Sequence, residues 1–137
     1  MKLLPHLSQH FPNGPDTTLR DHFQKYGVRI RQEDSYLQLK YDQIAAKWAE
    51  AIVQECRGHI LKYENGIWSF VSRPFDKFFD LGEGRCPVFD SKELARRLPE
   101  LVITEKLDGT CIQLWWDKGW HVSSLGTITT ELVQGQS

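Results

Sequence analysis

The residues best suited to covalent chemistry lie in one short segment, residues 104–110, with the sequence TEKLDGT. Lys106 stands two residues before Asp108-Gly109, and Asp-Gly is a strong turn signal. A lysine amine attacks an electrophile only when neutral, a state favoured by burial, nearby cations or a metal ion. Gly109 permits the tight turn and the close approach of a phosphate. The pattern predicts a nucleophilic lysine at a strand end; a surface turn with a solvated lysine is the alternative.

Two basic residues upstream are suited to binding phosphate groups. Arg57 presents a planar guanidinium, which donates two parallel hydrogen bonds to a phosphate. Lys77 lies in the phenylalanine-rich residues 75–79, where a base can stack beside a cation. Each feature also has a structural interpretation. Arg57 can pair with Glu55 or another carboxylate, and the phenylalanines can belong to the core.

Taken together, these segments resemble the phage-type ATP-dependent RNA ligases, in the branch associated with tRNA repair. The resemblance lies in the order and spacing of residues 55–58 (ECRG), 72–79 (SRPFDKFF) and 105–110 (EKLDGT), preceded by residues 41–44 (YDQI). It extends over about residues 17–127. The first two blocks are not shared by covalent nucleotidyltransferases in general, so they favour an RNA ligase over a DNA ligase or a capping guanylyltransferase.

The resemblance implies an enzyme that works through a lysyl-AMP intermediate. The lysine attacks the α-phosphate of ATP, the AMP passes to an RNA 5′-phosphate, and a 3′-hydroxyl then seals the strand and releases AMP. The implied cofactors are ATP and Mg²⁺, because charge on the transferring phosphoryl group must be neutralised. The implied partner is RNA with 5′-phosphate and 3′-hydroxyl ends, such as a nicked tRNA, and the implied process is RNA repair.

The same resemblance assigns roles to individual residues. Lys106 is the nucleophile, and Asp108 acts with it in the later steps. Arg57 and Lys77 hold the ATP phosphates and neutralise the leaving pyrophosphate. The remaining cofactor-binding positions pack near the adenine, contact the purine or complete the motif: Phe79 (or Phe78), Glu105 and Gly109. No residue of the chain is assigned as a metal ligand.

The elements that must position these residues are predicted to be strands with peripheral helices. Alternating or apolar segments predict strands over residues 28–31, 36–41, 59–63, 67–71, 101–107, 111–116 and 120–123. Capping signals and helical spacing predict helices over residues 17–26, 44–53 and 91–98, the last beginning at a Ser91 cap. This order predicts an α+β fold with an antiparallel sheet. The resemblance makes it part of a covalent nucleotidyltransferase (ATP-grasp-like ligase) domain.

Composition narrows the function classes. The net charge of −1 argues against a protein that coats nucleic acid by bulk charge, so phosphate binding must come from particular residues. The three cysteines form no CxxC pair, which argues against a zinc knuckle and indicates reduced thiols in a cytoplasmic protein. We expect no signal peptide and no membrane span. The histidines are interpreted as surface or structural residues, and Trp115, Trp116 and Trp120 as core and strand packing rather than a base-stacking platform.

Two departures from the family pattern qualify the expected activity. Leu125 occupies a position where the family usually has an arginine, which we expect to weaken a phosphate or RNA contact. The distal family motifs have no match before Ser137. We therefore expect residues 1–137 to be the N-terminal part of an RNA ligase adenylyltransferase domain, truncated, with full ligation requiring a C-terminal segment or a second polypeptide. The alternative function is a catalytically silent ligase-like module that binds nucleotide or RNA.

Overall fold

The computed structural model describes residues 1–83 and 90–128. The chain divides into two compact units. The first contains residues 1–77 and the chain from residue 111 onward, and the second contains residues 78–110. Within the described ranges, no helix is long and apolar enough to cross a membrane.

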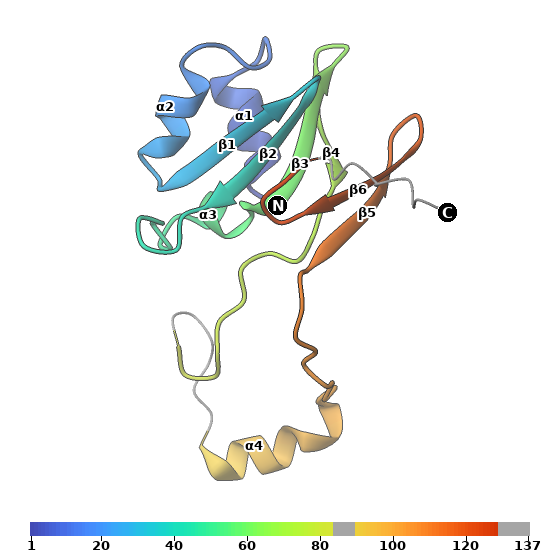
Figure 1. Cartoon of the computed structure of the whole chain (residues 1–137). Helices are drawn as coiled ribbons and strands as arrows, with labels where there is room; N and C mark the ends of the chain where they lie inside the picture. The colour runs from blue at the N-terminus through green and yellow to red at the C-terminus, as the bar shows by residue number, and fades with distance from the viewer. Residues whose placement is uncertain (84–89, 129–137) are drawn as a thin grey trace, which may run out of the picture. The chain divides into compact units, whose positions relative to one another are not determined.

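The first unit is built on a four-stranded antiparallel sheet (Figure 1). Its strands follow chain order: β1 (Val28–Glu33), β2 (Tyr36–Tyr41), β3 (Arg57–Glu64) and β4 (Ile67–Ser72). Asn65 and Gly66 both have positive φ angles, 53° and 78°, as the two-residue turn between β3 and β4 requires. The four predicted strands and this hairpin are confirmed. β2 has its predicted bounds, and β1, β3 and β4 are each longer than predicted.

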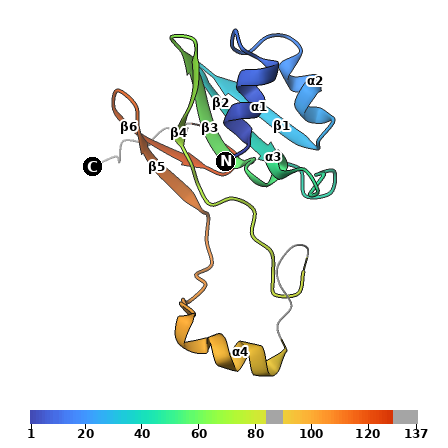
Figure 2. The same ribbon diagram turned by 180° about the vertical axis from the view of Figure 1, so that it is seen from behind.

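Helices cover one face of this sheet (Figures 1 and 2). They are α1 (Leu3–His10), which the sequence analysis did not predict, α2 (Leu19–Gln24) and the single-turn α3 (Ala51–Gln54). Leu3, Leu7 and Phe23 pack on Leu39 and Leu61 of the sheet, and all five are fully buried. The carboxylate of Glu55 accepts a hydrogen bond from the main-chain N–H of Leu3 (3.0 Å), which anchors the first turn of α1.

A second hairpin, β5 (Ile112–Trp116) and β6 (Trp120–Ser124), is attached to the other face of the sheet. At its turn, Asp117 accepts hydrogen bonds from Tyr36 Oη (2.8 Å) and Lys62 Nζ (2.9 Å). At its open end, Gln38 and Gln113 both donate to the carbonyl of Gly58, at 3.2 and 2.9 Å. Both ends of the hairpin are therefore fixed to the sheet.

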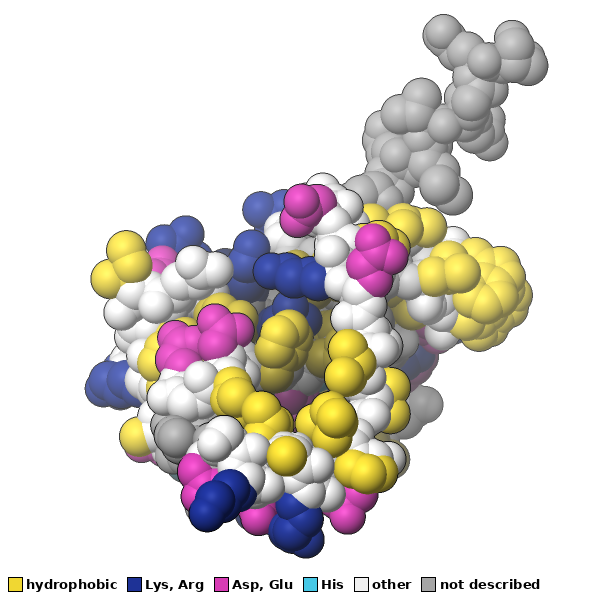
Figure 3. All heavy atoms as spheres, turned by 90° about the horizontal axis from the view of Figure 1, so that it is seen from below, with side chains coloured by type: hydrophobic (Ala, Val, Ile, Leu, Met, Phe, Trp, Pro, Cys, Tyr) yellow, Lys and Arg dark blue, Asp and Glu magenta, His cyan; other side chains and the backbone are white. Residues whose placement is uncertain are grey.

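The tryptophans of this hairpin divide between its two faces. Trp115 is buried with Ile60 and Ile128, as predicted. Trp116 and Trp120 are 61% and 65% exposed and pair across the strands, with ring centroids 5.4 Å apart. Figure 3 shows hydrophobic side chains gathered at the right edge, over β5 and β6. Of the three tryptophans interpreted as core and strand packing, Trp115 is in the core. Trp116 and Trp120 pack on each other across the strands on the opposite, exposed face, because alternate residues of a strand face opposite sides.

The second unit contains α4 (Ser91–Arg97), followed by a 3₁₀ turn over Leu98–Glu100. The helix is confirmed, but its cap is Asp90, which accepts a hydrogen bond from the N–H of Glu93 at 2.7 Å. Cys86 lies outside the described residues.

Two predicted elements are corrected. Residues 101–107 form no strand, and the predicted helix over residues 44–53 is reduced to α3. In the second case Asp42 accepts hydrogen bonds from the N–H groups of Ile44 (2.9 Å) and Ala45 (3.1 Å). The main-chain N–H of Ala46 also donates to the Asp42 carbonyl at 2.9 Å, so a single turn capped by Asp42 forms, but no helix continues from it before Ala51.

Candidate active site

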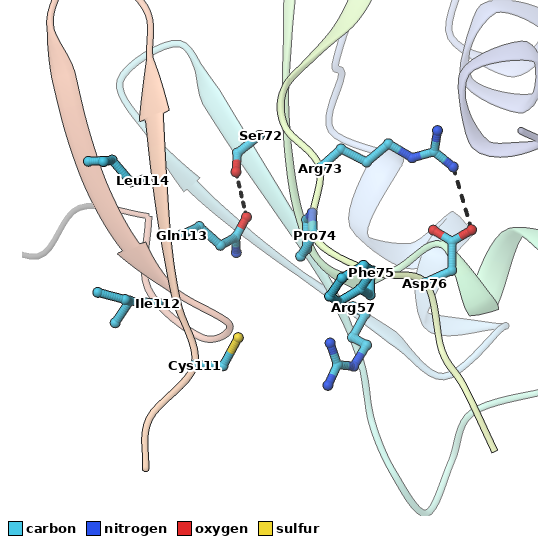
Figure 4. Close-up of a pocket in the computed structure, with 10 residues that line it drawn as sticks. All are labelled: Arg57, Ser72, Arg73, Pro74, Phe75, Asp76, Cys111, Ile112, Gln113 and Leu114. Carbon is cyan, nitrogen blue, oxygen red and sulfur yellow. Dashed lines mark hydrogen bonds and ion pairs between the residues drawn. The ribbon is translucent and has the colours of Figure 1, made fainter. Parts of the chain in front are cut away.

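Arg57, the first residue of β3, lines an open pocket of about 540 Å³ in the first unit (Figure 4). The pocket is lined by two segments distant in sequence: residues 72–76, which follow β4, and residues 111–114 at the start of β5. Ser72 Oγ joins the two by donating to Gln113 Oε1 at 2.6 Å. The arginine of the ECRG block and the first part of the SRPFDKFF block therefore belong to one cavity wall.

A relay of contacts through His59, Asp76 and Arg73 fixes residues 73–76, which form one wall of the pocket. The main-chain N–H of Arg57 lies 3.3 Å from Nδ1 of the buried His59, and His59 Nε2 lies 3.1 Å from Oδ1 of Asp76. Asp76 also contacts Arg73 at 3.5 Å. Burial lowers the pKa of His59 to about 4, although the Asp76 carboxylate acts in the opposite direction. The neutral ring accepts at Nδ1 and donates at Nε2.

Gly58 brings the turn that follows β6 against the ECRG block. Its φ is +86°, and a Cβ built there would lie 2.9 Å from Leu125 Cα and 3.0 Å from Leu125 O. A Cβ built on Gly126 would lie 3.3 Å from Lys40 Nζ. Only glycine at position 58 allows this contact. The structure thus places Leu125, where the family resemblance leads us to expect arginine, against Gly58, the residue that follows Arg57.

Lys77 is in the first unit but is not part of this pocket. Its N–H donates to the carbonyl of Gln54 at 2.7 Å, and its Nζ lies 5.4 Å from the centroid of the Trp48 ring. This is a cation–π geometry, with Trp48 as an aromatic partner that the sequence analysis did not predict. Phe75 and Phe78 are 81% and 62% exposed, so the interpretation of these two rings as core is wrong.

The remaining predicted residues lie in the second unit. Glu105, Lys106 and Asp108 are exposed, and Phe79 is half-buried. Gly109 has a φ of +146° with nothing within 4 Å of its Cβ position, so its conformation favours glycine in an open environment. The expected packing under the Lys106 stem is absent from the described residues, because the strand that should supply it does not form.

Sequence reasoning missed the relay of His59, Asp76 and Arg73. The available signal was His59 itself, a titratable side chain inside the apolar strand HILKY. It also missed that His6 and His10, four residues apart, share one face of α1. His6 Nε2 lies 2.8 Å from His22 Nε2. Over the described residues, no group of three or more His, Cys, Asp and Glu side chains is arranged to hold a metal ion.

Comparison with known proteins gives one informative similarity. The chain is 30% identical to a protein named RNA ligase from Rhodothermus phage RM378, in an alignment 141 positions long that covers 92% of this chain. This similarity supports an RNA ligase family for the chain. The chain spans about a third (31%) of that relative's length. No family model matches the chain, and no solved structure matches it.

The aligned region contains the Arg57 pocket, the relay and the Lys106 segment, since it covers nearly the whole chain. The pocket lined by Arg57 is open to solvent. The α+β architecture with an antiparallel sheet is compatible with a ligase domain.

Proposed function

We propose that this chain carries the nucleotide-binding and lysine-adenylylating part of an ATP-dependent RNA ligase of the tRNA-repair branch. The observation that carries the proposal is the similarity to the phage RNA ligase over 92% of the chain. The three sequence blocks and the pocket lined by Arg57 support it. Activity of the whole protein on RNA is part of the proposal.

The proposed first step is attack of Lys106 Nζ on the α-phosphorus of ATP. An N–P bond forms, the bond from the α-phosphorus to the bridging oxygen breaks, pyrophosphate leaves and the amine loses its proton. Arg57 and Lys77 neutralise the charge on the phosphates. Phe79 packs near the adenine, Glu105 contacts the purine, and Gly109 provides the turn. Magnesium would enter with the ATP phosphates, as Mg²⁺ usually does in nucleotide sites.

The proposed later steps return the lysine. An oxygen of the RNA 5′-phosphate attacks the adenylate phosphorus, the N–P bond breaks and the amine is released, with Asp108 beside it. The RNA 3′-hydroxyl then attacks the 5′-phosphorus, the phosphodiester forms and AMP leaves. In this scheme the relay of His59 and Asp76 holds the pocket wall and takes no proton from the reactants.

A second candidate is a catalytically silent ligase-like module that binds nucleotide or RNA. Two observations favour it: Leu125 stands where the family carries arginine, and the segment around Lys106 is exposed without strand partners among the described residues. Covalent chemistry at Lys106 separates the two candidates, because a silent module forms no adduct.

The test is intact-protein mass spectrometry after incubation with ATP and Mg²⁺. Lys106→Ala is the informative variant, and Lys92→Ala, another exposed lysine of the second unit, is the matched control. A mass gain of one AMP that persists in the Lys92 variant and disappears in the Lys106 variant supports the ligase. Labelling by GTP in place of ATP would indicate a capping-type enzyme. Absence of any adduct overturns adenylylation and leaves the silent module.

A further inference from the structure

Three basic residues form a row across the first sheet. In the antiparallel register, Arg29 of β1 is paired with Lys40 of β2, and Lys40 is paired with Arg57 of β3. Residues paired in register share a face of the sheet, with Cβ atoms about 5 Å apart. The row therefore runs from the edge strand β1 to the pocket lined by Arg57.

A second pocket lies at the outer end of the row. Arg29 and Lys40 line an open pocket of about 220 Å³ together with residues 41–43. Arg29 is 81% exposed although its guanidinium also pairs with Asp42 at 2.6 Å. Towards the inner end, the Lys40 ammonium lies near Gly126, in the turn that packs against Gly58, the residue after Arg57. Arg29 and Lys40 are exposed and Arg57 lines an open pocket, so all three cations are accessible to a ligand from solvent.

Like charges placed directly opposite each other destabilise a sheet. The row contains three positive charges and one acidic neighbour, Asp42, whose pKa is lowered by hydrogen bonds from Ala45 and Ile44 and by Arg29. A chain with a net charge of −1 does not accumulate such a row through general basicity. An anionic ligand that bridges the cations would remove the repulsion.

We propose that the row of Arg29, Lys40 and Arg57 binds the phosphate backbone of the RNA strand. Two strand spacings give the row a length of roughly 10 Å, over which a nucleic acid strand presents two or three phosphates. The inner end at Arg57 would receive the phosphate nearest the nucleotide, and Arg29 at the sheet edge a phosphate farther along the strand. This inference rests on the proposed ligase function for the identity of its ligand.

The experiment measures binding of a short 5′-phosphorylated single-stranded RNA, labelled at its 3′ end, by fluorescence anisotropy at several salt concentrations. Lys40→Gln and Arg29→Gln each remove one charge of the row. Arg31→Gln is the matched control, since it removes the same charge from the same exposed side of β1 but faces Gln38. Each row variant is expected to weaken binding about fivefold and to reduce the log–log salt slope by about 0.7.

Two further readouts make the result specific. Lys40→Gln is expected to raise the melting temperature of the free protein, because it removes like-charge repulsion; a lower melting temperature would show a structural role. Binding of ATP to the same variants distinguishes the two sources of phosphate. If Lys40→Gln weakens ATP binding and leaves RNA binding unchanged, the row belongs to the nucleotide and the proposal is wrong.

Wild-type protein separates this proposal from the ligase proposal. RNA binding that depends on the row, without any AMP adduct, supports the row and removes the ligase. An AMP adduct with no RNA binding, or with equal losses in the Arg31 and Lys40 variants, supports the ligase and overturns the row.

Discussion

Two segments with similar apolar content adopt different structures in this protein. β3 lies between β2 and β4, and its Ile60 and Leu61 are fully buried. Residues 101–107 (LVITEKL) carry the same kind of pattern, yet Val102 is 90% exposed and Leu107 is 78% exposed. β3 has hydrogen-bond partners on both sides, whereas the described residues provide no partner strand for residues 101–107.

The comparison teaches that strand formation depends on available neighbours more than on local propensity. A strand without a partner leaves its main-chain donors and acceptors to water and buries no side chain. Arg57, a predicted phosphate-binding residue, lies on the packed sheet, and Lys106, the predicted nucleophile, lies next to the exposed residues 101–105.

The largest expected effect is on core packing. Leu61→Ala should lower the free energy of unfolding by about 3 kcal/mol, because it removes a fully buried side chain and leaves a cavity. Leu107→Ala should change it by less than about 0.5 kcal/mol, because that side chain is 78% exposed. Urea denaturation followed by tryptophan fluorescence measures both. Equal losses in the two variants would contradict the contrast between the segments.

A smaller effect is expected at two glycines with positive φ. Gly58→Ala should cost about 2 kcal/mol, because a Cβ at φ +86° meets the Leu125 main chain at 2.9 Å. Gly109→Ala should cost less than about 1 kcal/mol, because its Cβ position is open and the segment can adjust. The same denaturation experiment measures both. A larger loss at Gly109 would show that residues 101–110 are packed in solution.

The pH dependence of stability tests the buried relay. Because the folded protein lowers the pKa of His59 to about 4, the neutral ring stabilises the fold above pH 6.5, and that stability is lost as the pH falls from 6.5 towards 4. His59→Gln should reduce the loss between pH 7 and pH 5 by about 1–2 kcal/mol. Some slope should persist, since the pKa values of His6 and His22 are also lowered. Identical slopes in wild type and variant would exclude a buried neutral His59.

The sheet could be predicted from sequence because its signals are local and agree with its tertiary contacts. Asn65-Gly66 fixes the β3–β4 hairpin, and alternation marks β1, β2, β5 and β6. α1 is not predicted from the sequence because Pro5 and four polar residues obscure its apolar face, which is defined only by the packing of Leu3 and Leu7 on the sheet. Residues 101–107 show the reverse case. Their apolar pattern predicts a strand, but no strand among the described residues pairs with them.

The site could be predicted in part for a similar reason. The block order pointed to Arg57, and the structure gives it a pocket with residues 72–76. The relay through His59 and the row through Lys40 depend on strand register, including the irregularity between Leu39 and Lys40. Register across three strands is a tertiary property, so neither arrangement can be read from residue types alone.

The smallest expected effect concerns position 125, where the packed unit presents leucine beside Gly58. Leu125→Arg would add a guanidinium beside Gly58, one residue from Arg57, and the half-buried position allows the longer side chain to reach solvent. If the proposed ligase is correct, the rate of AMP adduct formation or of RNA sealing should rise about two- to fivefold. Leu125→Met, which keeps the apolar contact without the charge, is the control. An unchanged rate with Leu125→Arg would overturn the hypothesis that leucine at this position weakens a phosphate or RNA contact.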